Sequence, residues 1–160
     1  MSTRYARGID EPTLTPEAVR RLLYRRDVAV ARHRTVLART LGLTDVEMLA
    51  LIHLAEHGEL APSAIAALLD LSSGGATSLV QRLGRAGHVT RHPHPTDRRS
   101  ILIRLSPATA DRLEAAGAPL DQGLESVAAR LTDDQSAAVA DVFTRLAALT
   151  EELEASIRRD

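Results

Sequence analysis

Apolar residues recur at helical spacing along most of this chain, and polar capping residues mark where the helices begin. Thr15-Pro16-Glu17 combines a capping hydroxyl, a proline at the first helical position and an acid in the first turn. The apolar positions that follow predict a long helix to about Thr40, ending before Gly42: Val19, Leu22, Leu23, Val30, Val36, Leu37 and Leu41. A terminal helix of roughly 25 residues is long for a small lobe, which favours packing against a second subunit.

The next segment predicts two helices joined by a short extended link. Thr44 and Glu47 form the capping-box pattern of a helix that ends at Gly58. This helix is apolar on nearly every side, so we expect it to be buried. Residues 59–61 are predicted to be extended, and Pro62 opens a short helix that ends at a tight turn over residues 70–72.

The helix after this turn has two different faces. Ser72 or Ser73 can cap its start, and Gly87 is expected to end it. One face is apolar and carries Ala76, Leu79, Val80, Leu83 and Ala86. The opposite face carries small polar and basic groups: Gly75, Thr77, Ser78, Gln81, Arg82 and Arg85.

A hairpin and two helices complete the pattern. Residues 88–92 and 100–105 are strand-like, and two prolines stiffen the loop 93–99 between them. Ser106-Pro107 starts a helix towards residue 130, which Gly117 and Pro119 are expected to kink or break. Thr132 and Gln135 start the last helix, which has an apolar row at Val139, Val142, Phe143, Leu146, Leu149 and Leu153.

These elements predict a mainly α protein with a small β-hairpin wing, in which the third and fourth helices form a helix-turn-helix. We expect one structural domain with three parts. Residues 1–43 form an N-terminal extension and dimerisation helix, residues 44–105 form a winged helix-turn-helix lobe, and residues 106–160 form C-terminal dimerisation helices.

Charge is distributed in blocks that the net charge of −1 conceals. Residues 1–40 and 72–104 are basic, whereas residues 41–71 and 105–160 are acidic. The block 72–104 holds six arginines and one acid. Because binding follows the local field, this block indicates an anionic partner for the two-faced helix and the hairpin. The absence of cysteine excludes disulfides and thiolate metal sites.

Double-stranded DNA fits this block. The polar helix face suits a major groove about 12 Å wide, where serine and threonine hydroxyls can bond bases or phosphates. Gln81 can pair with adenine, and Arg82 and Arg85 can reach phosphate or guanine. Gly74 and Gly75 let the backbone approach phosphates at the start of the helix. An arginine at the tip of the hairpin could enter the minor groove.

Two groups of motifs carry a resemblance to a known family. The more specific is Asp97-Arg98-Arg99, followed by an apolar strand and Leu105-Ser106; the other is Leu71-Ser72-Ser73 with residues 79–83 and 86–89. Through them, residues 41–106 resemble the MarR family of bacterial transcriptional regulators. Gly74-Gly75 departs from that pattern, in which larger residues are common.

The resemblance implies a function and several partners. It implies an obligate homodimer, joined by its N- and C-terminal helices, that binds a pseudo-palindromic operator and is released by a small anionic or phenolic ligand. It also implies that Asp97 braces the wing and that Arg99 enters the minor groove. Candidate effector-pocket residues, by position only, are Tyr24, Arg25, His33 and His53. We expect a repressor of nearby genes, located in the cytoplasm, with no cofactor.

The histidines allow a different chemistry, which the sequence supports less well. His53-Leu-Ala-Glu-His57 matches the H-x-x-E-H pattern of zinc proteases, but it has no obvious third ligand and lies in a helix that the core needs. Regulatory metal binding by His53 or His57 stays open, beside ordinary roles as a core histidine and a solvated helix end. We expect His88, His92 and His94 along the wing.

Catalytic motifs are missing from the sequence. It shows no Ser/His/Asp set, P-loop or dinucleotide fingerprint, so we do not expect an enzyme. A winged helix that dimerises and binds protein without DNA specificity is the main competitor, and the basic hairpin argues against it. No apolar run approaches the roughly 20 residues of a membrane span, so no membrane partner is expected.

Overall fold

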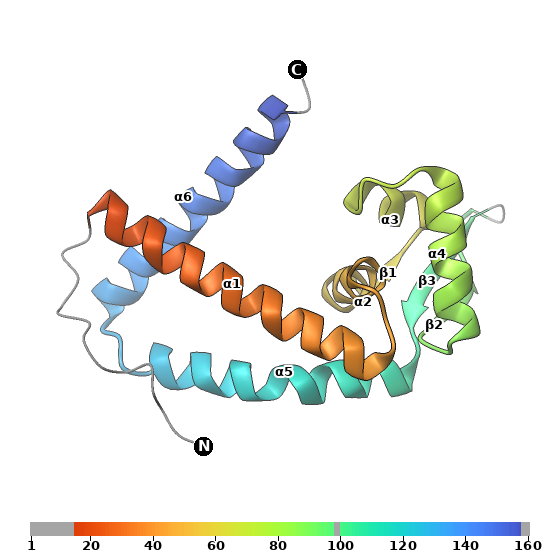
Figure 1. The fold of residues 1–160 in the computed structure, drawn as a ribbon, viewed down its shortest axis with the longest axis horizontal. Coiled ribbons are helices and arrows are strands. Elements are labelled where there is room, and N and C mark those ends of the chain that lie inside the picture. The colour runs from red at the N-terminus through yellow and green to blue at the C-terminus, as the bar shows by residue number, and fades with distance from the viewer. Residues whose placement is uncertain (1–14, 98–99, 158–160) are drawn as a thin grey trace. The chain divides into compact units, whose positions relative to one another are not determined.

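The computed structural model describes residues 15–97 and 100–157, and it divides the chain into two compact units, residues 1–111 and 112–160. The order of elements confirms the predicted mainly helical fold with a winged helix-turn-helix (Figure 1). They are α1 (Pro16–Leu41), α2 (Asp45–His57), β1 (Glu59–Leu60), α3 (Pro62–Leu68), α4 (Ser73–Arg85), β2 (Val89–Pro93), β3 (Ile101–Leu105), α5 (Pro107–Ala128) and α6 (Asp133–Ile157). Arg98 and Arg99 of the predicted wing lie outside the described residues.

Side chains cap the helices where the sequence predicts them. The Thr15 hydroxyl accepts a hydrogen bond from the backbone N–H of Ala18 at 3.2 Å, and Gly42, with a φ of 70°, ends α1. At α6, Gln135 accepts from the backbone of Thr132 at 2.9 Å and donates its own backbone N–H to the Thr132 hydroxyl at 3.3 Å. These bonds satisfy N–H groups that a helix start otherwise leaves without partners.

The core of the first unit lies where α2, α3, α4 and β3 meet. Its largest buried side chains are Met48, Leu51, Leu54, Ile65, Leu79, Val80, Leu83 and Ile103. The expectation that α2 is buried on nearly every side is wrong, because Val46 and Ile52 are 45% and 38% exposed. The helix packs on its neighbours with one side only, although apolar residues continue around it.

The two helices of the helix-turn-helix meet at a sharp bend. Asp70, whose φ of 51° is unusual for a residue other than glycine, sits in the turn, and Ser72 caps α4. No single described helix has both the length and the apolar composition needed to cross a membrane; α3 and α4 reach them only when taken together across their 109° bend.

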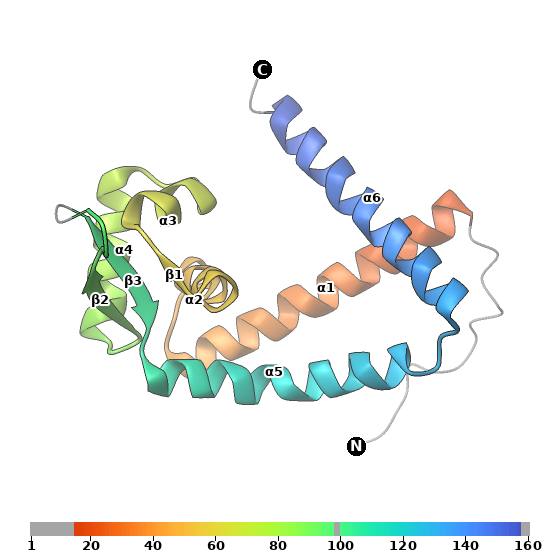
Figure 2. The same ribbon diagram turned by 180° about the vertical axis from the view of Figure 1, so that it is seen from behind.

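The sheet has three antiparallel strands in the order β1-β3-β2. The view from behind shows β3 between its two neighbours (Figure 2). Residues 59–60, predicted as an extended link, form a short strand in which Glu59 lies opposite Arg104 and is ion-paired with it. The other pairing runs from Val89 opposite Leu105 to Pro93 opposite Ile101 and forms the wing.

A buried polar contact joins the wing to the start of α5. His88 and Thr109 are 8% and 3% exposed, and the His88 Nδ1 lies 3.1 Å from the Thr109 hydroxyl. His88 directly precedes the first strand of the wing, and it is buried there rather than exposed. Of the predicted kink or break in α5, the break does not occur, because one helix runs from Pro107 to Ala128 with Pro119 inside it.

Within the residues that the structure describes, the second unit forms no buried core of its own. None of the side chains that the structure describes between residues 112 and 157 is buried. Its exposed apolar residues are Leu120, Leu124, Val127, Val139, Val142, Phe143, Leu149, Leu153 and Ile157. Two helices with this much apolar surface gain little hydrophobic stabilisation by themselves.

A carboxylate at the start of α2 ties this helix to α4. The Oε2 atom of Glu47 accepts from the backbone N–H and the hydroxyl of Thr44 at 3.0 and 2.9 Å. Its other oxygen, Oε1, accepts from the Nε–H of Arg82 at 2.9 Å. Both carboxylate oxygens are therefore used, one by the cap of α2 and one by the next helix of the motif.

These bonds determine the pKa of Glu47. Burial disfavours the charged carboxylate and is the largest single influence. The hydrogen bond from the Thr44 backbone, the Arg82 guanidinium and the Thr44 hydroxyl together outweigh it and lower the pKa of Glu47 below its ordinary value of 4.5. The charged form is therefore favoured more strongly in the folded protein than in the unfolded chain.

We predict that the stabilisation due to Glu47 is lost in acid. At neutral pH the carboxylate is charged in both states and its bonds favour the native one. As pH falls below 4.5 and through the lowered native pKa, this advantage disappears. The difference in free energy of unfolding between wild type and Glu47→Gln, from urea titrations at pH 7 to 3, should shrink on acidification. Glu56→Gln, which removes an exposed carboxylate from the same helix, is the control. A difference that grows towards low pH would contradict this account.

Candidate nucleic-acid interface

The helix α4 buries one side completely. Ala76, Leu79, Val80 and Leu83 are at most 2% exposed, as their spacing predicts. Ala86, predicted to share this face, is exposed, because the helix ends at Arg85 and Ala86 is its C-terminal cap. Gly87 follows with a φ of 77° and turns the chain towards the wing.

Three polar residues form a row on the opposite side of α4, which we call the front row: Ser78, Gln81 and Arg85. Their spacing of three and four residues places them on one face, and all three are exposed. None of the hydrogen bonds and ion pairs within the described residues uses their side chains. The front row is therefore held in place by the helix while its donors and acceptors face outward.

Two other predicted polar residues near the start of α4, Ser72 and Thr77, already have internal partners. The Ser72 hydroxyl accepts from the backbone N–H of Gly75 at 3.1 Å, and the Thr77 hydroxyl donates to the backbone carbonyl of Ser73 at 2.8 Å. A Cβ atom at Gly75 would lie 3.3 Å from the Ser72 hydroxyl, whereas one at Gly74 would meet open space. The lack of a side chain at Gly75 thus protects the cap of the helix.

Arg82 lies on the flank of α4 rather than in the front row. It is one residue, about 100° around the helix, from Gln81. Its side chain is 55% exposed although its Nε atom is bonded to Glu47. The structure thus places this predicted contact residue at the side of α4 that adjoins the start of α2.

A hollow beside α4 is lined by Arg91, a candidate DNA-binding residue that the sequence analysis did not identify. Gln81, Gly84 and Arg85 of α4 and Val89 and Arg91 of β2 line an open hollow of about 450 Å³. Two of these five residues are arginines, so the hollow suits an anionic group. Arg91 belongs to no recognised motif. Only its position in the basic block 72–104 could have pointed to it as a candidate DNA contact.

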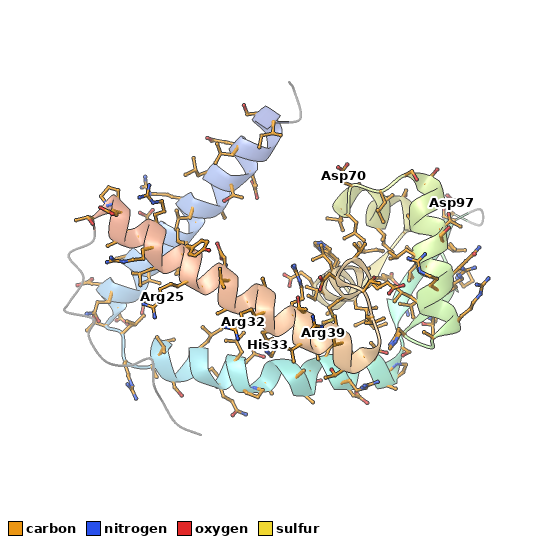
Figure 3. All side chains as sticks on the ribbon, in the orientation of Figure 1. Arg25, Arg32, His33, Arg39, Asp70 and Asp97 are labelled. Carbon is orange, nitrogen blue, oxygen red and sulfur yellow. The ribbon has the colours of Figure 1, made fainter. Side chains whose placement is uncertain are left out.

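The described part of the wing loop is held by its own side chains. The Nδ1 atom of His94 accepts from the backbone N–H groups of Thr96 and Asp97 at 3.3 and 3.2 Å. Asp97, which Figure 3 labels at the end of the hairpin, accepts from the Ser100 hydroxyl at 2.5 Å. The loop beside Arg98 and Arg99 is thus cross-linked by hydrogen bonds. The roles of those two arginines and of Asp97 towards DNA stay predictions.

The candidate effector residues come from two helices. Tyr24, Arg25 and His33 are exposed on α1, where Figure 3 labels the latter two on successive parts of the helix, and His53 is half-buried on α2. Tyr24 borders an open hollow of about 300 Å³ with Glu17, Arg20 and Arg21, which all belong to α1. The effector pocket stays a prediction.

The paired histidines of α2 lie one turn apart. Their rings are stacked, with centroids 6.2 Å apart. Across residues 15–97 and 100–157, no group of three or more histidine, cysteine or acidic side chains is placed to hold a metal ion. His53 and His57 therefore gain no third ligand from these residues.

Comparisons with known proteins agree with this geometry. The model of the MarR family matches residues 41–100, which span α2 to the wing. The uncharacterized HTH-type transcriptional regulator YcgE of Bacillus subtilis (strain 168) is 28% identical over 152 residues, or 95% of this chain and 96% of that protein.

Two solved structures share the fold. A mutant of MarR from E. coli, complexed with operator DNA, has a TM-score of 0.51 at 22% identity and covers 81% of this chain and 93% of its own. NadR in complex with 4-hydroxyphenylacetate has a TM-score of 0.57 at 20% identity and covers 92% of this chain and 98% of its own. The match over the lobe, the relative that spans nearly the whole chain and the shared fold make this chain similar to the MarR family of transcriptional regulators.

Proposed function

We propose that this DNA-binding regulator is a homodimer that recognises a pseudo-palindromic operator and represses nearby genes until a small molecule releases it. The observation that carries the proposal is the front row of α4. Ser78, Gln81 and Arg85 point away from a fully buried face, and they lie beside a basic wing. A rigid helix with an outward polar row is what direct contact with base edges in the major groove requires.

Base contacts and phosphate contacts fall to different residues in this proposal. Gln81 and Ser78 supply the groups that distinguish bases, because their side chains have no partner within the described residues. Arg91 borders the hollow beside α4 and suits a phosphate at the edge of the groove, whereas Arg85, in the front row, can reach guanine. Arg99 enters the adjacent minor groove, with Asp97 bracing it.

The second unit supports the dimer. Its helical residues, from 112 onward, expose a long set of apolar side chains, and none of their described side chains is buried. A second copy offers the same surface, and a two-fold interface between like surfaces would cover both. Residues 1–43 and 106–160 are the proposed dimerisation segments, with the lobe 44–105 between them.

A small anionic or phenolic ligand is the proposed effector. Support comes from NadR, a protein of the same fold whose structure holds 4-hydroxyphenylacetate. Tyr24, Arg25 and His33 provide a phenol, a guanidinium and an imidazole on α1, and these groups suit an aromatic acid. His53 is the proposed contribution of α2.

We predict a dimer in the absence of DNA. Phe143 is 57% exposed on the apolar row of α6, whereas Thr144 lies outside that row on the same helix. Phe143→Glu should shift the mass measured by light scattering at micromolar concentration from dimer to monomer, because it buries a charge in the interface. Thr144→Glu adds the same charge and should leave the dimer intact. A monomeric wild type would refute the dimer.

We predict a specific, two-fold symmetric binding site. Duplexes selected by the protein from a random pool should share two half-sites about 34–36 Å apart, one helical turn. Gln81→Ala and Ser78→Ala should each change the preferred bases and cost about 1–3 kcal/mol on the selected duplex. Gln122→Ala on α5 serves as the control. Equal competition by every duplex would instead favour a protein-binding winged helix.

We predict that Asp97→Ala weakens operator binding although it removes a negative charge. Pure electrostatics predicts tighter binding, whereas the bracing role predicts weaker binding, because a free arginine loses up to ~2 kcal/mol of side-chain entropy when it is fixed. Arg99→Ala should weaken binding strongly, with little change in melting temperature. Asp70→Asn removes a charge elsewhere in the lobe and is the matched control. Affinities at two salt concentrations decide the question, and tighter binding by Asp97→Ala would reject the brace.

A further inference from the structure

The bond between Glu47 and Arg82 is unlike an ordinary surface ion pair. The carboxylate side chain is 10% exposed and the arginine side chain is 55% exposed. Thr44 holds the carboxylate from the other side through Oε2. Glu47 is therefore a fixed acceptor, and Arg82 is the partner that reaches from it to the surface.

The bond uses the Nε atom of Arg82 and leaves the end of the guanidinium available. No hydrogen bond within the described residues uses the two terminal nitrogens. A guanidinium is planar, so a bond at Nε restricts the direction in which the terminal N–H groups point. Glu47 thus orients the terminal N–H groups of Arg82 without forming hydrogen bonds with them.

The position of Arg82 determines what those donors can meet. The front row occupies the middle of the exposed face of α4, and Arg82 lies on its flank, towards the start of α2. When a helix lies in a major groove, its middle faces the bases and its flanks face the phosphates that border the groove. A guanidinium on the flank of α4 is therefore suited to donate to a phosphate oxygen.

We propose that Glu47 is a positioning residue for DNA binding, which holds Arg82 by Nε so that its terminal nitrogens are aligned for a backbone phosphate. This inference rests on the proposed function. Fixing the side chain during folding removes part of the entropy loss that DNA binding otherwise demands. Glu47 contributes to affinity without touching DNA and in spite of its negative charge.

The test measures affinity and salt dependence on one arbitrary duplex, so that it needs no known operator. Arg82→Gln should weaken binding roughly tenfold and reduce the slope of log K against log salt by about 0.9 per protomer, because one phosphate contact is lost. Glu47→Gln should weaken binding roughly three- to tenfold with an unchanged slope, because Arg82 still reaches the phosphate but is no longer aligned. In the double variant, Glu47→Gln should cost nothing further.

Glutamine keeps the capping box of α2, and melting temperatures identify any variant that does not fold. Glu56→Gln, which removes an exposed charge from the same helix, should leave affinity equal or slightly tighter. If Glu47→Gln also binds equally or more tightly, the positioning role is wrong. If Arg82→Gln lowers only the melting temperature and leaves the slope unchanged, Arg82 is a structural strut and the inference is again wrong. Failure of the wild type to bind any duplex would instead reject the proposed function, and this inference with it.

Discussion

The helix α4 has to be fully buried on one side in order to hold the other side in a fixed orientation. Ala76, Leu79, Val80 and Leu83 meet that requirement within a helix of 13 residues. Neighbouring elements serve the same constraint: α3 packs against α4, β3 extends the core of the lobe, and Glu47 of α2 fixes the flank of α4. If the buried face of α4 were packed less tightly, Ser78, Gln81 and Arg85 would move relative to any bound surface. Contacts that depend on angstrom-scale placement would then be lost.

Most of the helix boundaries could be predicted from the sequence, because they depend on interactions between residues close together in the chain. The caps at Thr15, Thr44 and Thr132 involve residues at most three positions apart, so their patterns predicted the helix starts directly. β1 escaped prediction because two residues carry no periodicity, and their strand exists only through pairing with β3. Ile52 was misplaced because the apolar pattern of α2 does not say which side lacks a neighbour.

The candidate site was predictable in its residue types and less so in its partners. Spacing alone identified Ala76, Leu79, Val80 and Leu83 on the buried face of α4 and the three residues of the front row, but it wrongly added Ala86 to the buried face and Arg82 to the front. The Glu47–Arg82 bond joins residues 35 positions apart, and the contact between His88 and Thr109 spans 21, so neither has a local signature. Such bonds depend on how the helix-turn-helix and the wing close on each other, which is a property of the packed lobe.

The front row has a consequence for how the regulator can diversify. Because Ser78, Gln81 and Arg85 have no hydrogen bond or ion pair within the described chain, replacing them should cost folding little, since exposed substitutions usually change stability by less than about 0.5 kcal/mol. Arg82 and Ser72, which also hold the helix in place, lack that freedom. In the proposed function, evolution can therefore change which genes respond by altering three side chains, while the scaffold that presents them stays under separate selection.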